Sequence, residues 1–330
     1  MIGSYGGLVG FGLLLLLMAA GLHVATSMFL VSIAGALFIM GPSILATFGS
    51  QLWSTLNDYL LTAIPLFILM GELLLRSGVT DRMYASLSDW LDRLPGGLLH
   101  TNIGASAMFA AISGSSVATA ATIGSVAVPE LKRRAYDEKW VLGTIAAGGT
   151  LGILIPPSVN LIIYGAMTDT SVGDLFLAGI IPGLILTGLF MVAVIVATLA
   201  RPGIAGEKDE IAPMIQRLAR LRSLLPPVAI FLIVLGSIYG GFATPTEAAA
   251  TGVVLALLLA ALNGALSITM LHQAFLSTIK MTAMILLIMV AAFYLSFIAN
   301  VIGVPQAMSK LISDLGIGPV QTLWLLVLFY

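Results

Sequence analysis

The chain has 330 residues, of which 59% are hydrophobic and only 9% are charged, and its mean hydropathy is +1.09. A water-soluble domain of this size needs far more polar surface, so the composition excludes a soluble protein and predicts an all-α, multi-pass membrane protein. The net charge of −1 suggests no nucleic-acid partner, and the lack of cysteine excludes disulfides and thiolate metal sites.

Continuous apolar segments predict the membrane spans, and more polar segments separate them. The predicted spans cover residues 6–20, 24–40, 59–75, 140–167, 175–199, 224–239, 246–262 and 281–302. Interfacial or amphipathic segments are predicted at residues 42–58, 76–97, 201–222, 267–280 and 305–315, and the chain turns apolar again from residue 320.

Residues 98–128 are apolar and rich in small side chains, and the polar sequence Ser113, Gly114, Ser115 and Ser116 divides them. Each arm has about 15 residues and would measure roughly 22 Å as a helix, against a hydrocarbon core of about 30 Å. Neither arm can cross a membrane alone. We therefore expect a re-entrant hairpin that enters the membrane, turns at a polar tip and leaves on the side it entered.

The distribution of basic residues favours the same topology. Twelve of the 14 Lys and Arg residues lie in three connections, residues 76–97, 129–139 and 201–222. The positive-inside rule places all three connections in the cytoplasm. The first two flank the hairpin, so a single crossing by residues 98–128 would put them on opposite faces, whereas a re-entrant hairpin keeps them together.

A second interruption is predicted within residues 140–168, which carry Gly148, Gly149 and Thr150 and then Pro156, Pro157 and Ser158. The two prolines remove backbone donors and free carbonyl oxygens one turn earlier. We expect a discontinuous helix whose carbonyls bind a cation. The alternative for this break is an ordinary proline kink. The alternative for the hairpin tip is that its small residues only allow close helix packing.

The hairpin tip and the helix break together predict a binding site. Hydroxyl and carbonyl oxygens are hard ligands that suit Na⁺, and the positive end of the second hairpin arm suits an anionic group. Asn160 and Tyr164 follow the break four residues apart, so they lie on one helical face and are candidates to line the same cavity.

Other titratable residues are better explained by structure. Glu72 lies four residues before Arg76, which predicts an interfacial ion pair. The sequence from Thr244 to Glu247 predicts a capping box at the start of a helix. His100 lies near the start of the hairpin and is expected to be structural.

A weak internal repeat links residues 77–97 to residues 302–319. Each copy has a glycine-containing turn, an amphipathic segment and a Gly/Pro-rich lead into an apolar stretch. The predicted orientations of the copies are opposite, which is typical of the inverted repeats of secondary transporters. The register predicts a second hairpin tip beyond Tyr330, so we expect an incomplete second repeat and a chain that is a fragment or lacks half of its core.

Three stretches carry a resemblance to a known family. The sequences GASAMFAAISGSSVATAATIGSVAVPEL, AAGGTLGILIPPSVNLIIYG and FATPTEAAATGVV resemble the large membrane subunit of tripartite ATP-independent periplasmic (TRAP) transporters. The resemblance runs along essentially the whole chain. It implies an elevator-type fold of the ion transporter superfamily, Na⁺-driven import of organic acids, and a location in the bacterial inner membrane. It also implies two partners, a small membrane subunit and a periplasmic substrate-binding protein.

The resemblance also implies site residues. The Na⁺ site is expected to be formed by Ser113, Gly114, Ser115, Ser116, Gly149, Thr150 and Pro156. The substrate is expected near Ser115, Ser116 and Asn160. Na⁺ is the coupling ion, and no other cofactor is expected.

These inferences predict the domain organisation of the chain. Scaffold helices and a connecting amphipathic helix are expected in residues 1–97, half of a transport domain in residues 98–168, mostly further scaffold in residues 169–302, and the start of a second hairpin unit in residues 303–330. The resemblance implies that the transport domain slides on the Na⁺ gradient. No role for ATP is expected, because no phosphate-binding loop is present.

Two other classes stay open at this point. One is a channel-like or scaffold subunit without coupled transport. The other is an intramembrane hydrolase that uses a tip serine, but this needs a base, and no histidine falls where the predicted topology would bring it to mid-membrane.

Overall fold

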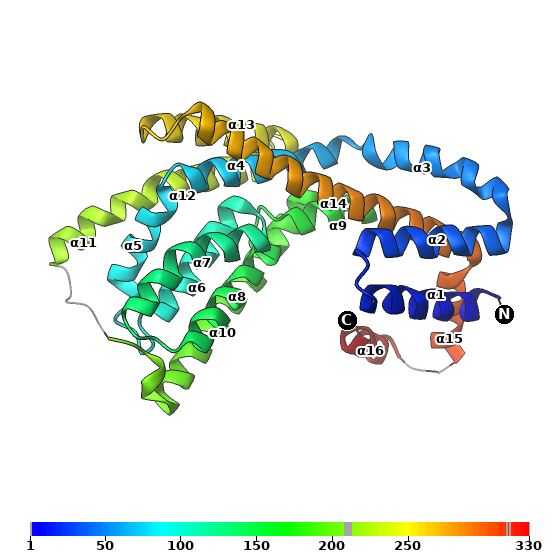
Figure 1. Ribbon diagram of the computed structural model, residues 1–330, viewed down its shortest axis with the longest axis horizontal. Helices are drawn as coiled ribbons and strands as arrows, with labels where there is room; N and C mark the ends of the chain where they lie inside the picture. The colour runs from blue at the N-terminus through cyan, green and yellow to red at the C-terminus, as the bar shows by residue number, and fades with distance from the viewer. Residues whose placement is uncertain (1, 208–212, 315, 317, 330) are drawn as a thin grey trace. The chain divides into compact units, whose positions relative to one another are not determined.

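The computed structural model describes residues 2–207, 213–314, 316 and 318–329, and these residues form helices and connections without a strand (Figure 1). Six helical stretches of the described chain are long and apolar enough to cross a membrane. They are Tyr59–Arg76, Glu138–Thr168, Val172–Ala200, Met214–Tyr239, Pro245–Leu262 and Ile268–Ile302. The predicted all-α, multi-pass membrane protein is confirmed at this level.

The chain divides into two compact units, of which unit 1 contains residues 1–58 and 283–330. Its elements are α1 (Ile2–Ala19), α2 (Val24–Met40), η1 (Pro42–Leu45), α3 (Ala46–Leu56), the end of α14 (Ile268–Ile302), α15 (Val304–Asp314) and α16 (Pro319–Phe329). A small core forms around Tyr294, whose ring meets that of Phe48 edge-on at 4.9 Å between centroids.

Unit 2 contains residues 59–282. Its elements are η2 (Tyr59–Thr62), α4 (Ala63–Arg76), α5 (Val79–Leu91), α6 (Leu98–Ser113), α7 (Ser116–Arg133), α8 (Glu138–Leu154), α9 (Val159–Thr168), α10 (Val172–Ala200), η3 (Pro202–Ile204), α11 (Met214–Leu221), η4 (Arg222–Leu224), α12 (Leu225–Tyr239), α13 (Pro245–Leu262) and the start of α14.

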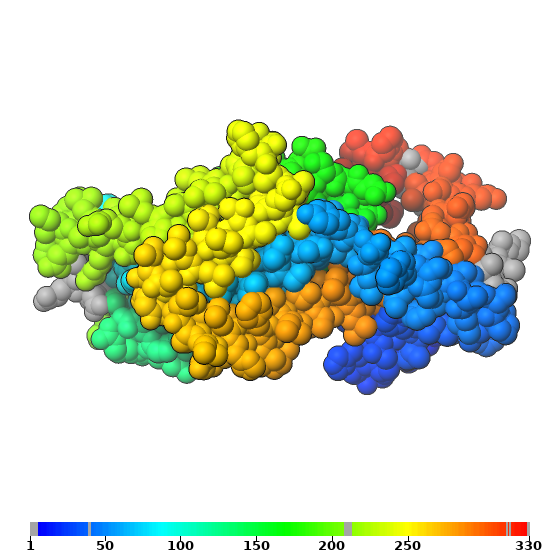
Figure 2. Space-filling model, turned by 90° about the horizontal axis from the view of Figure 1, so that it is seen from above, coloured from blue at the N-terminus to red at the C-terminus, as the bar shows by residue number. Residues whose placement is uncertain are grey.

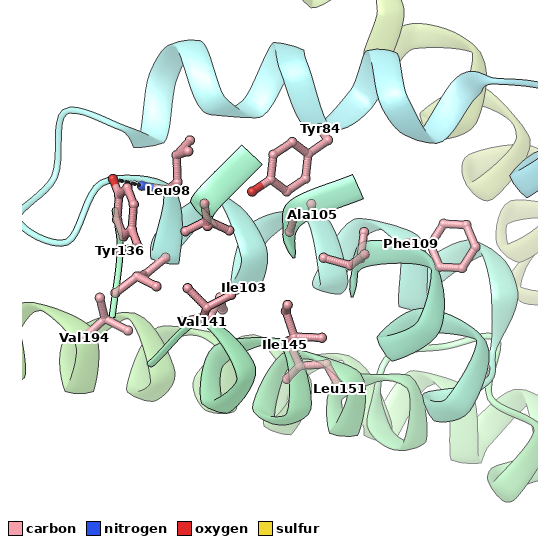
Figure 3. Packing of buried hydrophobic residues seen from close by; sticks show 14 of the residues in the cluster. Tyr84, Leu98, Ile103, Ala105, Phe109, Tyr136, Val141, Ile145, Leu151 and Val194 are labelled. Carbon is pink, nitrogen blue, oxygen red and sulfur yellow. Dashed lines mark hydrogen bonds between the residues drawn. The ribbon is translucent and has the colours of Figure 1, made fainter. Parts of the chain in front are cut away.

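Helix α6 lies at the centre of unit 2 and is buried along most of its length. Leu98, Ile103 and Phe109 of α6 pack in one cluster with Ile145 of α8 and Val194 of α10 (Figure 3). Small residues make this close packing feasible, because a side chain at Gly148 of α8 would collide with Ser106 of α6.

A buried chain of hydrogen bonds ties α6 to its neighbours. The Tyr84 hydroxyl of α5 donates to Asn102 Oδ1 at 2.7 Å, and Asn102 Nδ2 donates to Thr144 Oγ1 of α8 at 3.0 Å. Burial raises the pKa of Tyr84, so its hydroxyl keeps its proton and remains a donor. Both polar atoms of the Asn102 side chain therefore have a partner, and the hydrogen bonds fix the register of three helices.

The two ends of the α6–α7 pair are held together by contacts that we call the hairpin clasp. The Leu98 N–H donates to the Tyr136 hydroxyl at 3.1 Å, drawn as a dashed line in Figure 3. Arg134 forms an ion pair with Asp92 at 3.5 Å. The start of α6 and the end of α7 therefore lie side by side, so α6 and α7 form a helical hairpin.

Some predicted boundaries are wrong. Helix α14 is continuous from Ile268 to Ile302, where we expected an interfacial segment followed by a separate span, because no Gly or Pro interrupts it. Helix α7 continues through Pro129 to Arg133, beyond the predicted end of the hairpin arm at residue 128. The glycines of residues 148–149 lie inside α8, so the break in residues 140–168 is confined to residues 155–158.

Two local predictions are confirmed. Arg76 Nη2 lies 3.1 Å from Glu72 Oε2, as expected for an ion pair between residues four apart. Helix α13 begins with the complete capping box of Thr244 and Glu247.

The clasp can be tested with Tyr136→Phe, which removes the acceptor of the buried Leu98 N–H. We expect the free energy of unfolding to fall by about 1–3 kcal/mol, because the donor loses its partner. Thermal unfolding in detergent, followed by tryptophan fluorescence, measures the change. Tyr164→Phe, at an exposed position of α9, is the matched control and should leave the midpoint unchanged. Equal midpoints for both variants would contradict the clasp.

Candidate functional site

The tip of the hairpin is a tight turn between α6 and α7. Gly114 ends α6 in the left-handed conformation with φ +62°, and a side chain there would collide with the Pro157 carbonyl. Ser115 is extended and caps α7, its hydroxyl accepting the Ala118 N–H at 3.3 Å. Glycine is required at position 114 by both the conformation and the close approach.

The tip is hydrogen-bonded to the helix break. Helix α8 ends at Leu154 and α9 begins at Val159, whose N–H donates to the Gly114 carbonyl at 3.1 Å. The Ser158 hydroxyl donates to the Ile153 carbonyl at 2.7 Å. In a regular helix this carbonyl would accept from residue 157, but Pro157 has no N–H to donate. The tip therefore provides an acceptor for the first N–H of α9, and the break provides a donor for a carbonyl near the end of α8.

Glycines of α8 form the surface on which α7 begins. A Cβ at Gly152 would lie 2.9 Å from the Ser115 carbonyl carbon and from the Ser116 nitrogen. A Cβ at Gly149 would lie 2.9 Å from the Ala120 Cβ and 3.2 Å from the Ser116 oxygen. Contacts this short leave no room for a methyl group, so the backbone of α8 approaches the tip directly.

The structure places the predicted site residues unevenly. Ser113, Gly114, Gly149 and Pro156 are buried, Ser115 and Ser116 are half-buried, and Thr150 and Asn160 are exposed. The four tip residues and Gly149 lie together. The Thr150 hydroxyl instead donates to the Ala147 carbonyl of its own helix at 2.7 Å. Asn160 lies in the first turn of α9, directly after Val159, which binds the tip.

Thr119 joins the tip, and the sequence analysis missed it. Its buried hydroxyl donates to the Ser115 carbonyl at 2.7 Å and lies 3.2 Å from the Ser113 hydroxyl. The Ser113 oxygen also lies 3.5 Å from the Ser115 nitrogen. A signal was available, because Thr119 follows the cap residue by four positions and so faces back toward the turn.

Glu72 is the second residue that the sequence analysis did not place at the tip. It lines a cavity of about 10 Å³, the size of one water molecule, together with Ser113 and Ser115. Its neighbour Gly71 brings α4 against the tip, since a Cβ there would lie 2.8 Å from the Ser113 Cα. Sequence spacing alone links Glu72 to Arg76 but carries no information about this tertiary contact.

Arg76 holds the Glu72 carboxylate from the other side. Its Nε and Nη2 lie 3.2 and 3.1 Å from Glu72 Oε2. The guanidinium also donates to Gln273 Oε1 at 2.8 Å and to Ser277 Oγ at 3.1 Å, both on α14. Glu72 is the one acidic residue among the described residues that line the tip cavity, and it is paired with Arg76.

The chemistry of the tip is that of a neutral oxygen site. The serine and threonine hydroxyls interact with one another and with backbone groups. Such oxygens coordinate hard monovalent cations or donate to a carboxylate. Within the described part of the chain, no three His, Cys, Asp or Glu side chains are grouped as metal ligands.

Comparison with known proteins identifies the family. Residues 11–330 match the family model described as the DctM component of the tripartite ATP-independent periplasmic transporter. The chain is 34% identical over 326 residues to the C4-dicarboxylate TRAP transporter large permease protein of Rhodobacter capsulatus, covering 94% of this chain and 73% of that protein.

Two further relatives differ in the substrates that their names state. The ectoine TRAP transporter large permease protein of Halomonas elongata is 31% identical over 94% of this chain and 72% of its own length. The sialic acid TRAP transporter large permease protein of Vibrio cholerae is 35% identical over 78% of this chain and 58% of its own length. The chain therefore belongs to the DctM family, the large permease components of tripartite ATP-independent periplasmic transporters, and is a transport protein rather than an enzyme.

Proposed function

We propose that this permease subunit imports small organic acids by Na⁺ symport, with the α6–α7 hairpin and the α8–α9 break as the core of a moving transport domain. The observation that carries the proposal is the hydrogen bond between Val159 and the Gly114 carbonyl, which joins the tip to the break. Paired irregular segments of this kind bind ions and substrates in secondary transporters. Family membership excludes the hydrolase alternative.

The ion site in this proposal comprises Ser113, Gly114, Ser115 and Ser116 with Gly149, Thr150 and Pro156. The contact of Gly149 and Gly152 with the start of α7 supports the proposal, because it brings α8 against the tip. The substrate carboxylate binds beside Ser115, Ser116 and Asn160, where the N-terminus of α7 contributes a positive dipole. The relatives transport different compounds by name, so the substrate class proposed here is organic acids in general.

The membrane arrangement is part of the same proposal. The hairpin clasp keeps the start of α6 beside the end of α7, which supports a re-entrant hairpin with both ends at one membrane face. The hairpin and the broken helix belong to unit 2, and the other spans supply the scaffold against which they slide. In this proposal the protein works in the bacterial inner membrane, the location that its family implies.

Two partners complete the proposed transporter. The family is tripartite, so the permease acts with a small membrane subunit and a periplasmic substrate-binding protein. The binding protein delivers the organic acid to the tip from the periplasmic side, and Na⁺ entry drives the movement of the transport domain.

The ion assignment is tested by Ser115→Ala and Ser116→Ala in the complete transporter. Each variant is expected to lose Na⁺-dependent carboxylate uptake, because one hydroxyl ligand at the tip is removed. Uptake into proteoliposomes with and without a Na⁺ gradient measures this. Normal Na⁺-dependent uptake in both variants would refute the site. Uptake that persists in the wild type without a Na⁺ gradient would favour a channel-like subunit.

The contact of the tip with α8 is tested by Gly152→Ala. The added methyl group would lie within 2.9 Å of the Ser115 and Ser116 backbone, so we expect weaker stabilisation of the purified protein by NaCl relative to KCl. Gly143→Ala is the matched control on the same helix, because a Cβ there meets nothing within 4 Å. Equal Na⁺ responses in the two variants would show that the contact does not matter for the ion.

The topology is tested with single cysteines, which is practical because the chain has none of its own. Arg93→Cys and Lys139→Cys flank the hairpin on exposed positions and are expected to react with an impermeant maleimide from the same side. Thr170→Cys, in the connection after α9, should react from the opposite side. Labelling of residues 93 and 139 from different sides would overturn the re-entrant hairpin.

A further inference from the structure

Unit 2 contains an apolar cavity that lies beside the candidate ion site. It has a volume of about 400 Å³ and lies between α6, the break after α8, α10 and α12. Every side chain that lines it is apolar, including those of Ala111, Ile155, Leu184, Phe231 and Leu232. It shares only Pro156 with the candidate ion site. A cavity of this size and character suits an apolar ligand rather than water or an organic acid.

The cavity opens on the exposed apolar surface of two candidate membrane spans. Leu184 of α10 is 65% exposed and Leu232 of α12 is 60% exposed, although both line the cavity. Exposed apolar side chains of a span face acyl chains in a membrane. An acyl chain of the bilayer matches the apolar mouth between α10 and α12 in chemistry.

An exposed stripe of the same span meets the cavity at Leu232 and carries a cation toward its other end. Residues 214–239 form one helical span, and Figure 2 shows its α11 end, in yellow-green, uncovered on one face of unit 2. Leu218, Arg222, Leu225, Ala229 and Leu232 are exposed and follow one another at spacings of three or four, so they form one stripe.

Arg222 has the chemistry and the distance expected for a phosphate contact. Its side chain is exposed and forms no ion pair with the described residues, whereas nearby Arg220 pairs with Asp89 at 2.9 Å. Leu232, at the mouth of the cavity, lies ten residues further along the helix, or about 15 Å. A phospholipid whose phosphate meets Arg222 can run down the stripe and place an acyl chain in the cavity.

We propose that one anionic phospholipid binds here, with its phosphate on Arg222 and an acyl chain in the cavity. The Arg222 guanidinium, which has no ion pair among the described residues, provides the charge complementarity, and the stripe joins it to the apolar cavity. The bound chain would contact α6 and the break, the two elements that carry the candidate ion site. Binding of the lipid requires neither Na⁺ nor a substrate, so this site can be tested independently of the proposed transport.

The headgroup contact is tested by native mass spectrometry of the purified protein with phosphatidylglycerol or phosphatidylcholine. The wild type is expected to retain phosphatidylglycerol preferentially. Arg222→Gln should weaken that retention about fivefold, the effect of one surface charge on an anionic lipid. Arg201→Gln, an exposed arginine after α10, is the matched control and should leave retention unchanged. Equal losses in both variants would overturn a specific headgroup contact.

The acyl-chain contact is tested by filling the cavity. Ala111→Phe is expected to abolish retention of both lipids, whereas Ala229→Phe, on the stripe but outside the cavity lining, should retain them. Retention that responds to Arg222→Gln but not to Ala111→Phe would mean that only the headgroup binds, and would overturn the proposal. Arg222→Gln changes an exposed side chain, so it remains informative if Ala111→Phe fails to fold.

Discussion

The arrangement of unit 2 depends on how two irregular backbone segments satisfy each other. A turn and a helix break leave backbone donors and acceptors unpaired, and lipid offers nothing to replace them. Here the Gly114 carbonyl of the turn accepts the Val159 N–H that opens α9, and the Ser158 hydroxyl serves a carbonyl of α8. Each segment is hydrogen-bonded to the other or to its own helix, so hairpin and broken helix form one structural element.

Small residues bring these two segments together. Glycines at positions 149 and 152 let the start of α7 lie on α8, and Gly71 lets α4 reach the tip. Helices that pack this closely gain dispersion contacts and do not depend on water to drive association. The same substitution, glycine to alanine, is therefore expected to be harmless at Gly143 and costly at Gly152, although both lie on one helix.

Much of this organisation can be predicted from the sequence. The polar tip at residues 113–116 and the proline break are local interruptions of apolar runs, and a local pattern reveals them. The position of Glu72 at the tip cavity depends on which helices pack together, which spacing does not encode, and the role of Thr119 depends on the geometry of the turn. The continuity of α14 was missed because Lys280 and nearby polar residues suggested an interfacial segment, although nothing in the backbone interrupts the helix.

The pairing of Glu72 with Arg76 has a consequence for how tightly an ion is held. A full carboxylate charge facing the tip would favour slow release of any cation bound there. Because the guanidinium already neutralises that charge at 3.1 Å, an ion at the proposed site would be held by dipoles alone. Weak, dipolar coordination permits rapid exchange, and a coupling ion must leave the protein in every cycle as readily as it enters.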